Sequence, residues 1–536
     1  MIFLKKIIFL ILLAIASSGA DLYPFTIGGN EVIRRKIENL STFRTVDRIY
    51  NIYCIPSVRD VYINHDFEPF WEDKARAGDL IEEIRHCDEE GLNPTDYHLE
   101  EILELQGDTS IEGTTDLDII LTDACLLYLS HMLVGKVNPI TIDPEWHVVK
   151  SDRNPLKYFY HIDSLDFGEI VRSITPQNLN YAQLKNRLSQ YRQLAKTGEP
   201  GSIPDGEVLR PGMKDPRIPM IRELQAFYTG ENSSPPDPEI YDDTLREEVI
   251  RFQRLNGLEA QGIIGPQTLI MMNRTLQDRI SCIEANMERI RWLPLEFPEY
   301  YVLVNIANFE LHLIEHGQVA RIHNVVVGKP FRMTPVFSST MQYIVLNPTW
   351  TVPPTILRED LIPEIRKNKL ALSQKNIKVY DQQGKPLDPD SVDWSDRQVF
   401  SYIYRQDAGQ GNALGQVKFM FPNPFNVYLH DTPHKELFQR TERAFSSGCI
   451  RVQKPLELAE YLLRDQPEYS KGQIRRIIES GVTQTVMLKK RPEVFLLYLT
   501  AWVDGNGGIN FRRDIYERDR KLIDALAATP VYDLSP

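Results

Sequence analysis

A histidine and a cysteine nineteen positions apart, His430 and Cys449, are the residues of this sequence best suited to do chemistry. A thiol of ordinary pKa is mostly protonated at neutral pH, and a neighbouring imidazole raises the share of the reactive thiolate. Cys449 could instead be half of a disulfide, a zinc ligand or a simple buried thiol. The surrounding sequence must decide between these four roles.

The residues between the two form a path that leads out and back. The stretch "NVYLH" (426–430) alternates and is prone to β-structure, so we expect His430 at a strand end, before a break at "DTP". "KELFQRTERAF" (435–445) is capable of forming a helix, and "SSGC" (446–449) is a tight turn. This path can bring the imidazole and the thiol together.

The tight turn supplies groups that acyl transfer requires. Gly448 gives the backbone freedom, and the N–H groups of Gly448 and Cys449 could point at a developing oxyanion. Arg451 follows closely, and it could hold a substrate carboxylate or support the turn. These residue types favour a nucleophilic cysteine.

The competing roles of Cys449 have less support. A zinc site could use His430, His434 and Cys449, but Pro433 forbids a regular helix between the histidines. The spacing argument for a metal therefore fails, and we expect an exposed His434. A disulfide would need a partner in predicted helical regions, and the odd cysteine count leaves at least one thiol unpaired. The other cysteines are Cys54, Cys87, Cys125 and Cys282.

The N-terminus has the pattern of a signal peptide. Lys5 and Lys6 precede an apolar run (7–16), and "SSGA" (17–20) offers a cleavage site after Ala20. An uncleaved anchor is the alternative, and lipid anchoring is not expected because no cysteine lies near the site. We expect no other segment long and apolar enough to cross a membrane. The sequence thus predicts a mature protein that is soluble outside the cytoplasm and whose free cysteine is kept for chemistry.

Length and charge restrict the function classes. A chain of 536 residues is too long for one ordinary core, so we expect about three to four structural units. The net charge of −13 argues against a nucleic-acid binder, and it leaves a neutral or zwitterionic polymer open as a partner.

The first part of the chain reads as a helical scaffold. Residues 30–200 carry apolar positions at helical spacing, and "LDIILTDACLLYLSHMLVGK" (117–136) is apolar on most sides, which is typical of a buried helix. Cys125 lies in that stretch and is most simply a core residue. The region offers no clustered acid, base or nucleophile.

A compact three-helix unit follows a Gly/Pro-rich linker (196–219). Asp242 or Asp243 can cap the helix in "DDTLREEVIRFQRLNG" (242–257), and Pro266 opens the next one. The order FQ…NGL…GIIGPQTL resembles the peptidoglycan-binding three-helix module over roughly 209–275. The resemblance implies that this unit binds peptidoglycan.

Beyond residue 294 the apolar period switches to that of strands. "YYVLVNIAN", "ELHLIEHGQ" and "ARIHNVVVGK" predict an antiparallel meander. Residues 357–418 are charged and rich in turns, so they look like an inserted cap, before β-structure returns at "VKFMFPNPFNVYLHD".

The segment around Cys449 is similar to the signature of the L,D-transpeptidase (YkuD-type) catalytic domain, a His followed by Ser/Thr-His-Gly-Cys-x-Arg/Asn. The resemblance extends through residues 325–356 and 412–433. Together with the helical scaffold and the peptidoglycan-binding module, the chain resembles the large periplasmic L,D-transpeptidases of Gram-negative bacteria. Two departures stand out. Ser447 occupies the position of the motif's second His, and Asp431 that of the Gly after the first, so the group that orients His430 stays unidentified.

The resemblance implies that Cys449 is the nucleophile and His430 the base. It implies that Ser446, Ser447 and Gly448 form the turn, that Arg451 matches the final basic position, and that Tyr428 and Trp350 line the groove. The implied reaction is transfer from tetrapeptide stems to form 3→3 diaminopimelate cross-links through a thioester, with no cofactor or metal. Carbapenems would acylate the same thiol.

We therefore predict a multidomain α+β protein. The predicted parts are a signal peptide (1–20), a helical scaffold (21–205), a peptidoglycan-binding domain (206–280), a catalytic domain (281–490, with the cap at 357–418) and a C-terminal extension (491–536). The alternatives are a same-fold hydrolase, either an L,D-carboxypeptidase or a protein-detaching amidase, and a non-catalytic peptidoglycan-binding scaffold. A secreted cysteine protease lacks a recognisable Asn/Asp context. Peptidoglycan is the expected partner, and recruitment by cell-wall synthesis proteins is left open.

Overall fold

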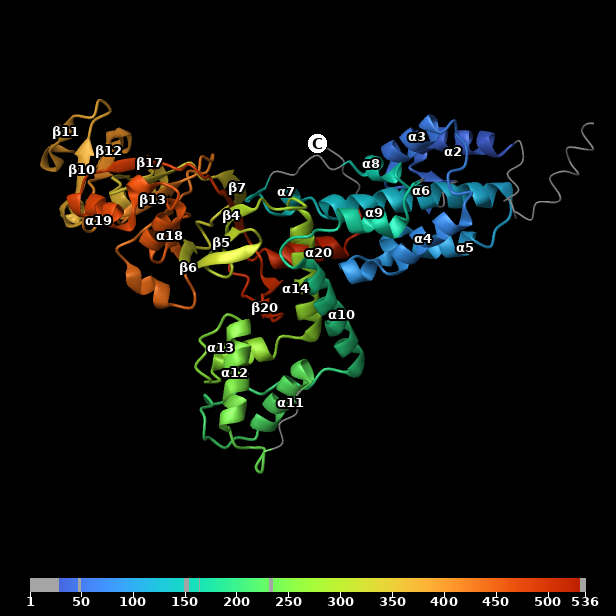
Figure 1. Cartoon of the computed structure of the whole chain (residues 1–536), viewed down its shortest axis with the longest axis horizontal. Coiled ribbons are helices and arrows are strands. Elements are labelled where there is room, and N and C mark those ends of the chain that lie inside the picture. Colours follow the sequence, from blue (N-terminus) through green and yellow to red (C-terminus); the bar gives the residue numbers. More distant parts are fainter. Residues whose placement is uncertain (1–27, 47–49, 149–153, 163, 231–234, 531–536) are drawn as a thin grey trace, which may run out of the picture. The chain divides into compact units, whose positions relative to one another are not determined.

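A computed structural model describes residues 28–46, 50–148, 154–162, 164–230 and 235–530, so the predicted signal peptide lies outside the described residues (Figure 1). The chain divides into two compact units. The helical unit contains Met1–Val137, Asp152–Thr175 and Leu526–Pro536, and the larger unit contains Asn138–Ser151 and Pro176–Ala525. The predicted class, multidomain α+β, is confirmed.

The helical unit is built around one central helix. Its helices are α2 (Gly29–Phe43), α3 (Ile55–Asn64), α4 (Lys74–Arg85), α5 (Leu99–Leu105), α6 (Ile111–Val134), α8 (Pro155–Phe159) and α9 (Phe167–Ile174). A two-stranded hairpin of β1 (Thr45–Val46) and β2 (Tyr50–Asn51) links α2 to α3. Figure 1 shows α6 running through the middle of this unit.

The buried helix predicted at 117–136 is α6, and its burial is confirmed. Over an 18-residue window its mean hydropathy is 1.6, and 94% of that window is buried. We expected no segment after the N-terminus to be long and apolar enough to cross a membrane. That expectation was wrong, because α6 has the length and the apolar composition of such a segment. The surrounding helices cover this apolar surface, so α6 serves as the core of the unit.

Buried acids of α6 hold neighbouring chain segments in place. Asp123 accepts hydrogen bonds from the Tyr53 and Cys54 N–H groups at 2.9 and 2.6 Å, where α3 begins. Asp118 accepts from the Tyr62 hydroxyl at 2.6 Å and from the Trp71 N–H at 2.8 Å. Burial raises the pKa of Asp118 to about 6.

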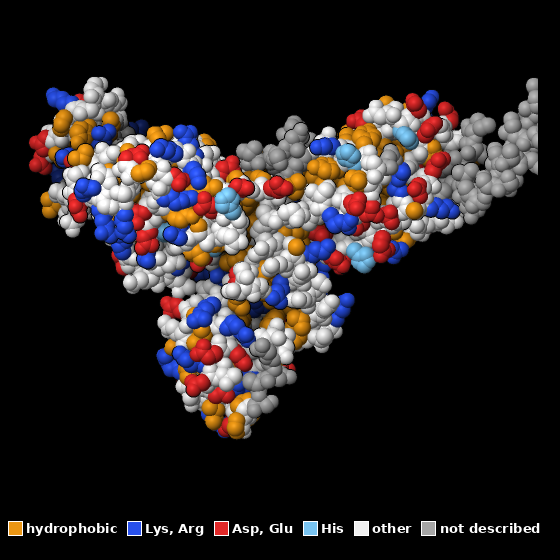
Figure 2. All heavy atoms as spheres, viewed as in Figure 1, with side chains coloured by type: hydrophobic (Ala, Val, Ile, Leu, Met, Phe, Trp, Pro, Cys, Tyr) orange, Lys and Arg blue, Asp and Glu red, His pale blue; other side chains and the backbone are white. Residues whose placement is uncertain are grey.

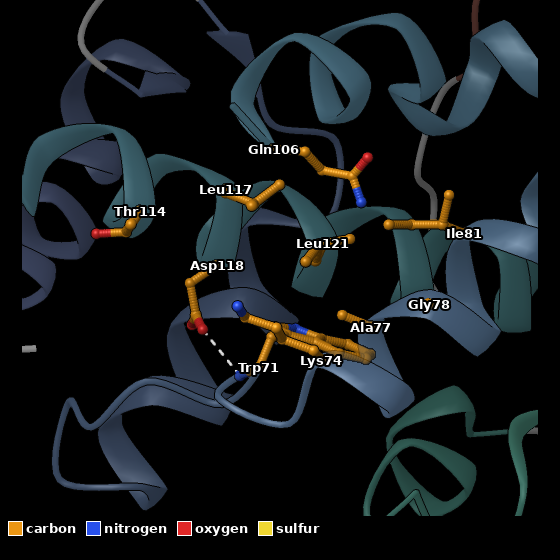
Figure 3. A pocket seen from close by; sticks show the side chains of 10 residues that line it. All are labelled: Trp71, Lys74, Ala77, Gly78, Ile81, Gln106, Thr114, Leu117, Asp118 and Leu121. Carbon is orange, nitrogen blue, oxygen red and sulfur yellow. Dashed lines mark hydrogen bonds between the residues drawn. The ribbon is translucent and has the colours of Figure 1, made fainter. Parts of the chain in front are cut away.

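Asp118 lies at the edge of a pocket of about 240 Å³ in this unit (Figure 3). The pocket is lined by Trp71, Lys74, Ala77, Gly78, Ile81, Gln106, Thr114, Leu117, Asp118 and Leu121. Because the Asp118 carboxylate already accepts three hydrogen bonds from the protein, we assign it a structural role.

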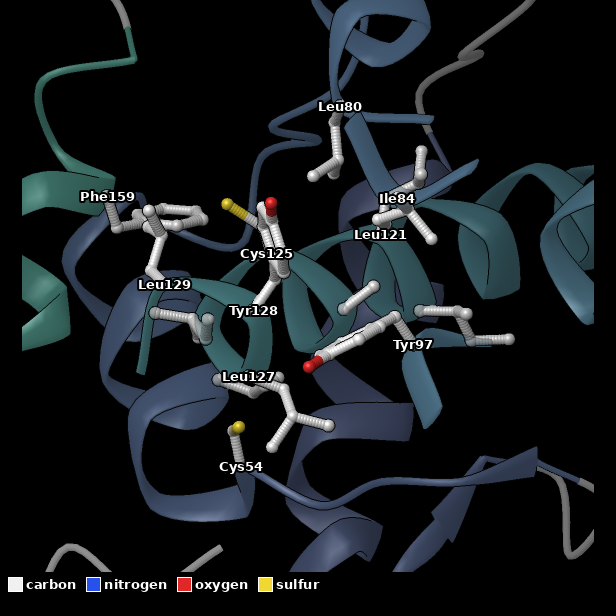
Figure 4. Close-up of a cluster of buried hydrophobic side chains, with 14 of the residues drawn as sticks. Cys54, Leu80, Ile84, Tyr97, Leu121, Cys125, Leu127, Tyr128, Leu129 and Phe159 are labelled. Carbon is white, nitrogen blue, oxygen red and sulfur yellow. The ribbon is translucent and has the colours of Figure 1, made fainter. Parts of the chain in front are cut away.

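All five cysteines are free, and four of them have no exposed surface. Figure 4 shows Cys54 and Cys125 among apolar side chains of the helical core, as expected for Cys125. The fully buried cysteines are Cys54, Cys87, Cys125 and Cys282. Cys449 alone is partly exposed. Because it is a free thiol, the disulfide alternative for it is removed.

The larger unit begins with α7 (Pro139–Ile142) and β3 (Trp146–His147) and continues with α10 (Tyr181–Thr197), which packs against α14 (Leu276–Arg291). Between them lies the three-helix module, α11 (Ile218–Thr229), α12 (Asp243–Leu255) and α13 (Pro266–Met272). Asp242 caps α12 by accepting the Leu245 N–H at 2.9 Å, and Pro266 is the first residue of α13, as predicted.

Gln253 links the FQ and GIIGPQTL segments of this module through its side-chain amide. Its Oε1 accepts the Gly262 N–H at 2.9 Å, and its Nε2 donates to the Ile263 carbonyl at 2.8 Å and to Thr268 Oγ1 at 3.1 Å. Gly262 has φ +67°, which favours glycine. One buried amide thus joins α12, the turn and α13.

A twelve-stranded sheet dominates the rest of the unit, in the order β17-β8-β13-β14-β16-β6-β5-β4-β18-β7-β3, with β15 beside β6. The predicted meander is β4 (Tyr300–Asn305), β5 (Glu310–Glu315) and β6 (Gln318–Gly328). The other strands are β7 (Val336–Thr340), β8 (Tyr343–Leu346), β13 (Val417–Met420), β14 (Leu429–His430), β15 (Ala444–Ser446), β16 (Ile450–Val452), β17 (Gln484–Met487) and β18 (Glu493–Leu497).

The remaining helices and a hairpin complete the unit. They are α18 (Pro455–Leu462), α19 (Lys471–Ser480), α20 (Asp519–Ala527) and the hairpin of β19 (Ala501–Val503) with β20 (Ile509–Phe511). The predicted C-terminal extension includes β18, which pairs with β4 and β7 inside the sheet. The predicted domain boundaries stay predictions, and the two-unit division assigns Pro176 and later residues to the larger unit.

The inserted cap has a core of its own. Its sheet, in the order β11-β10-β12-β9, contains β9 (Trp350–Thr351), β10 (Ile377–Tyr380), β11 (Pro386–Leu387) and β12 (Ile403–Gln406). Its helices are α15 (Pro354–Ile356), η4 (Leu357–Leu361), α16 (Ile362–Lys367) and α17 (Ala371–Gln374). The buried core of the cap runs from Val352 to Tyr404. It therefore ends before residue 418, the predicted C-terminal boundary of the cap, and residues from Val417 onward belong to the large sheet.

The net charge of −13 is not gathered into one acidic patch on the face shown in Figure 2, where acidic and basic side chains are interspersed.

Candidate active site

Two neighbouring strands, β14 and β16, bring the predicted histidine and cysteine together. In the parallel pair β14–β16, His430 lies opposite Arg451, which sets Tyr428 beside Cys449. Residues opposite one another on paired strands share a face, as do residues two apart on one strand. Tyr428, His430, Cys449 and Arg451 therefore lie on one face of the sheet, with His430 at a strand end as predicted.

The group that orients His430 is a main-chain carbonyl. Nδ1 of His430 donates to the Asp431 carbonyl at 2.5 Å, so Nε2 carries the lone pair. Burial, together with the charge of Arg451, lowers the pKa of His430 to about 3. The imidazole is therefore neutral at physiological pH and able to accept a proton.

Asp431 replaces the glycine of the related motif without disturbing this arrangement. Its carboxylate accepts the Gln416 N–H at 2.9 Å and pairs with Lys435. A Cβ at Gly415, whose φ is +59°, would overlap the Asp431 side chain. A glycine at 415 thus provides the space for the carboxylate at 431.

Cys449 is a thiol at rest. Its Sγ donates to the Asn426 carbonyl at 3.7 Å. Burial raises the pKa of Cys449, against the hydrogen bonds from Tyr428 and the charges of Lys418 and Arg451. The thiol must therefore lose its proton to a base during the reaction.

The turn has the predicted tightness, but its N–H groups are used differently from the expectation. Gly448 has φ +109°, and its N–H donates to Ser446 Oγ at 3.2 Å, so that N–H is occupied. Ser446 Oγ in turn donates to the Cys449 carbonyl at 2.5 Å. Within the described part of the chain the Cys449 N–H has no hydrogen-bond acceptor, so of the two N–H groups only this one is free to bind a ligand oxygen.

The prediction that residues 435–445 could form a helix is wrong. Only Lys435–Gln439 forms a short 3₁₀ turn, η7, and Ala444–Ser446 is the strand β15. The Arg443 carbonyl accepts the Val327 N–H at 2.9 Å, so pairing with β6 outweighs the local helix propensity.

A zinc role for the same residues has no geometric basis. His434 is exposed, and its ring contacts Glu436 at 3.3 Å. Among the described residues, no group of three His, Cys, Asp or Glu side chains is placed to hold a metal ion.

Comparison with protein families assigns the domain. Residues 299–478, which include His430 and Cys449, match the family of the L,D-transpeptidase catalytic domain. This part of the chain is therefore similar to the L,D-transpeptidase catalytic domain. Residues 56–188 match a "Scaffold domain", and residues 220–272 match a "Putative peptidoglycan binding domain". The three resemblances noted in the sequence are thereby confirmed.

A curated relative from Haemophilus influenzae, "Putative L,D-transpeptidase", is 37% identical over 241 residues. The match spans 45% of this chain and 48% of the relative, about half the length of each. L,D-transpeptidase structures from Xylanimonas cellulosilytica (14% identity, 55% of this chain and 99% of that chain, TM-score 0.18) and Stackebrandtia nassauensis (12%, 56% and 97%, TM-score 0.21) also match.

Tyr428 and Trp350 are also brought together in the transpeptidase domain. Burial and the adjacent Cys449 raise the pKa of the Tyr428 hydroxyl, and Trp350, in β9 of the cap, lies near enough to this hydroxyl to lower that pKa in part. The rings of Tyr428 and His430 lie 5.6 Å apart, centroid to centroid. The cap therefore reaches the residues around the thiol.

Arg332 is a residue of the candidate active site that sequence reasoning missed. Its Nη1 donates to Ser447 Oγ at 2.9 Å and to Asp360 at 2.5 Å, and its Nη2 donates to Asp360 at 2.9 Å and to Glu359 at 2.8 Å. Asp360 and Glu359 belong to η4 of the cap. Arg332 thus joins the cap to the catalytic turn, and Ser447 serves as its acceptor. Its distance of 115 positions from Ser447 leaves no local sequence signal.

Thr334 also holds the turn at 446–449 in place through hydrogen bonds. Its Oγ1 donates to the Gly448 carbonyl at 2.9 Å and accepts the Gly328 N–H at 2.9 Å. The Lys329 N–H donates to the Ser446 carbonyl at 3.0 Å. The segment 328–334 of the transpeptidase domain therefore fixes both ends of the turn.

We expect Arg332→Met to loosen both the catalytic turn and η4. The bidentate contact with Asp360 is part-exposed, so its loss should cost about 1 kcal/mol of local stability, or roughly fivefold faster amide exchange. Hydrogen–deuterium exchange of peptides covering 357–361 and 446–449 measures this. Arg358→Met, at an exposed arginine of η4, is the matched control and should change neither peptide. Unchanged exchange in Arg332→Met would remove the link between cap and turn.

Proposed function

We propose that this protein is a cysteine L,D-transpeptidase that forms 3→3 cross-links between diaminopimelate residues of peptidoglycan. One observation carries the proposal. A neutral, buried His430, held at Nδ1 by a main-chain carbonyl, shares a sheet face with the partly exposed thiol of Cys449. This pair lies within the residues that match the catalytic-domain family.

The first half-reaction acylates the cysteine. His430 Nε2 takes the thiol proton as Sγ attacks the carbonyl of diaminopimelate at position 3 of a tetrapeptide stem. The tetrahedral oxyanion accepts a hydrogen bond from the Cys449 N–H. Its collapse breaks the amide bond, and the imidazolium returns the proton to the amine of the departing D-Ala. A thioester on Cys449 remains.

The second half-reaction transfers the acyl group. The side-chain amine of diaminopimelate in a second stem attacks the thioester and loses a proton to His430, and the thiolate leaves. The thiol then regains its proton from the imidazolium. Exclusion of water by the cap, which Arg332 holds beside the turn, favours the amine over hydrolysis.

The other domains fit this role. The module at 220–272 would hold the polymer while the transpeptidase domain acts on its stems. The N-terminal lysines and apolar run support export to the periplasm, with cell-wall biogenesis and cell shape as the processes served and carbapenems as acylating inhibitors.

Product analysis tests the proposal. Purified protein is incubated with disaccharide-tetrapeptide, and the products are identified by mass spectrometry. Cross-linked dimers with loss of one D-Ala are expected, and they should disappear after the exposed thiol is blocked with iodoacetamide. Tripeptide without dimers would favour the hydrolase instead, and unchanged substrate would favour a non-catalytic scaffold.

A further inference from the structure

Two cationic side chains face the same space as the thiol. Lys418 of β13 lies opposite His430, and His430 lies opposite Arg451 of β16. Because cross-strand partners share a face, both cations stand on the face of His430 and Cys449. Lys418 Nζ is 3.8 Å from the centre of the Tyr428 ring.

Neither cation is neutralised by the protein. Among the described residues, neither Lys418 nor Arg451 forms an ion pair or a hydrogen bond, and Nε of Arg451 is buried without a partner. The Asp431 carboxylate is occupied by Lys435 and the Gln416 N–H. Glu436 is the one carboxylate whose charge acts on Arg451.

Lys418 and Arg451 are each partly buried. A partly buried cation without a counter-charge carries a desolvation cost, so proteins keep such groups mainly where a ligand supplies the opposite charge. Burial lowers the pKa of Lys418 and the pKa of Arg451, which is the sign of this cost. Arg332, by contrast, has two carboxylates of its own. Lys418 and Arg451 are therefore available to bind an anionic group of a ligand.

We propose that Lys418 and Arg451 form a carboxylate subsite that holds an acidic group of the acyl donor beside the carbonyl attacked by Cys449. The identity of the donor rests on the proposed function, whereas the subsite itself does not. A tetrapeptide stem has suitable chemistry, with a carboxylate on diaminopimelate and another at its C-terminus. Lys418, outside the family signature, is then a specificity-determining residue.

The competing role for the two cations is to stabilise the thiolate alone. Paired alkylating agents separate the two roles, because iodoacetate and iodoacetamide both consume the thiolate but only iodoacetate carries a charge. A cation that stabilises the thiolate changes both rates equally. A cation that attracts a carboxylate changes the ratio of the two rates.

The measurement is the rate of Cys449 alkylation by each reagent, followed by mass spectrometry at low ionic strength. We expect the iodoacetate-to-iodoacetamide ratio to exceed that of N-acetylcysteine about five- to tenfold and to fall as salt is added. Lys418→Met should remove most of this excess, and Lys418→Arg should keep it. Lys471→Gln, a charge loss at an exposed residue of α19, is the control and should leave the ratio unchanged.

The iodoacetate-to-iodoacetamide rate ratio of the wild-type protein tests the subsite even if a variant fails to fold. A ratio equal to that of N-acetylcysteine would overturn the subsite, and so would an equal fall of both rates in Lys418→Met. Turnover is not involved, so the two proposals fail separately. A raised ratio without D-Ala release would overturn the proposed function and leave the subsite standing.

Discussion

Replacing Cys449 with alanine is expected to reduce D-Ala release from a tetrapeptide by more than about a thousandfold, because no other described thiol reaches solvent. Cys449→Ser should be nearly as inactive, since a hydroxyl is a much weaker acid than a thiol and a neutral imidazole cannot ionise it. Covalent mass increase with a carbapenem should vanish in both variants.

The four buried cysteines provide the control for this result. Cys125→Ala should keep both D-Ala release and acylation, because Cys125 lies in the core of the helical unit (Figure 4). A thermal melt of each variant separates loss of chemistry from loss of folding. Activity above about one tenth of wild type in Cys449→Ala would contradict the assigned nucleophile.

Replacing His430 with glutamine should slow acylation at neutral pH by about a hundred- to ten-thousandfold, because the thiol, whose pKa is raised by burial, then has no base. The loss should shrink as the pH rises, since the thiol ionises unaided. His434→Gln is the matched control at an exposed histidine and should keep the wild-type rate. A flat deficit across alkaline pH would argue against His430 as the base.

His430 also determines how the stability of the folded protein changes with pH. The pKa of His430 is about 3 in the folded protein, below its ordinary value of 6.5. Between these values the unfolded chain binds a proton that the folded chain does not, so stability is present above pH 6.5 and falls as the pH drops toward 3. In denaturant titrations, His430→Gln should show a smaller fall over this range, and an unchanged slope would contradict the low pKa.

Local patterns predicted much of the fold correctly. Capping by Asp242, the first position of Pro266 and the burial of 117–136 depend on neighbouring residues, and all three are confirmed. The helix allowed at 435–445 failed because pairing of β15 with β6 is non-local. Propensity carries no information about such a partner.

The active site divides in the same way. His430 and Cys449 could be selected from type, spacing and family resemblance, and the sheet register sets them on one face. Arg332 could not, because its contact with Ser447 spans 115 positions. Lys418 could not, because its place beside His430 depends on the register in which β13 pairs with β14. The orienting carbonyl of Asp431 was also out of reach, since every residue has a carbonyl and only geometry distinguishes this one.

The hydrogen bond from His430 to a main-chain carbonyl affects how the protein tolerates mutation. Where a side chain orients the base, one codon change can remove it, but a backbone carbonyl persists whatever residue stands at position 431. The genetic constraint moves instead to Gly415, where any side chain would collide with Asp431. Drift at 431 toward smaller residues would relax that constraint, so the two positions form a coupled pair on which selection acts jointly.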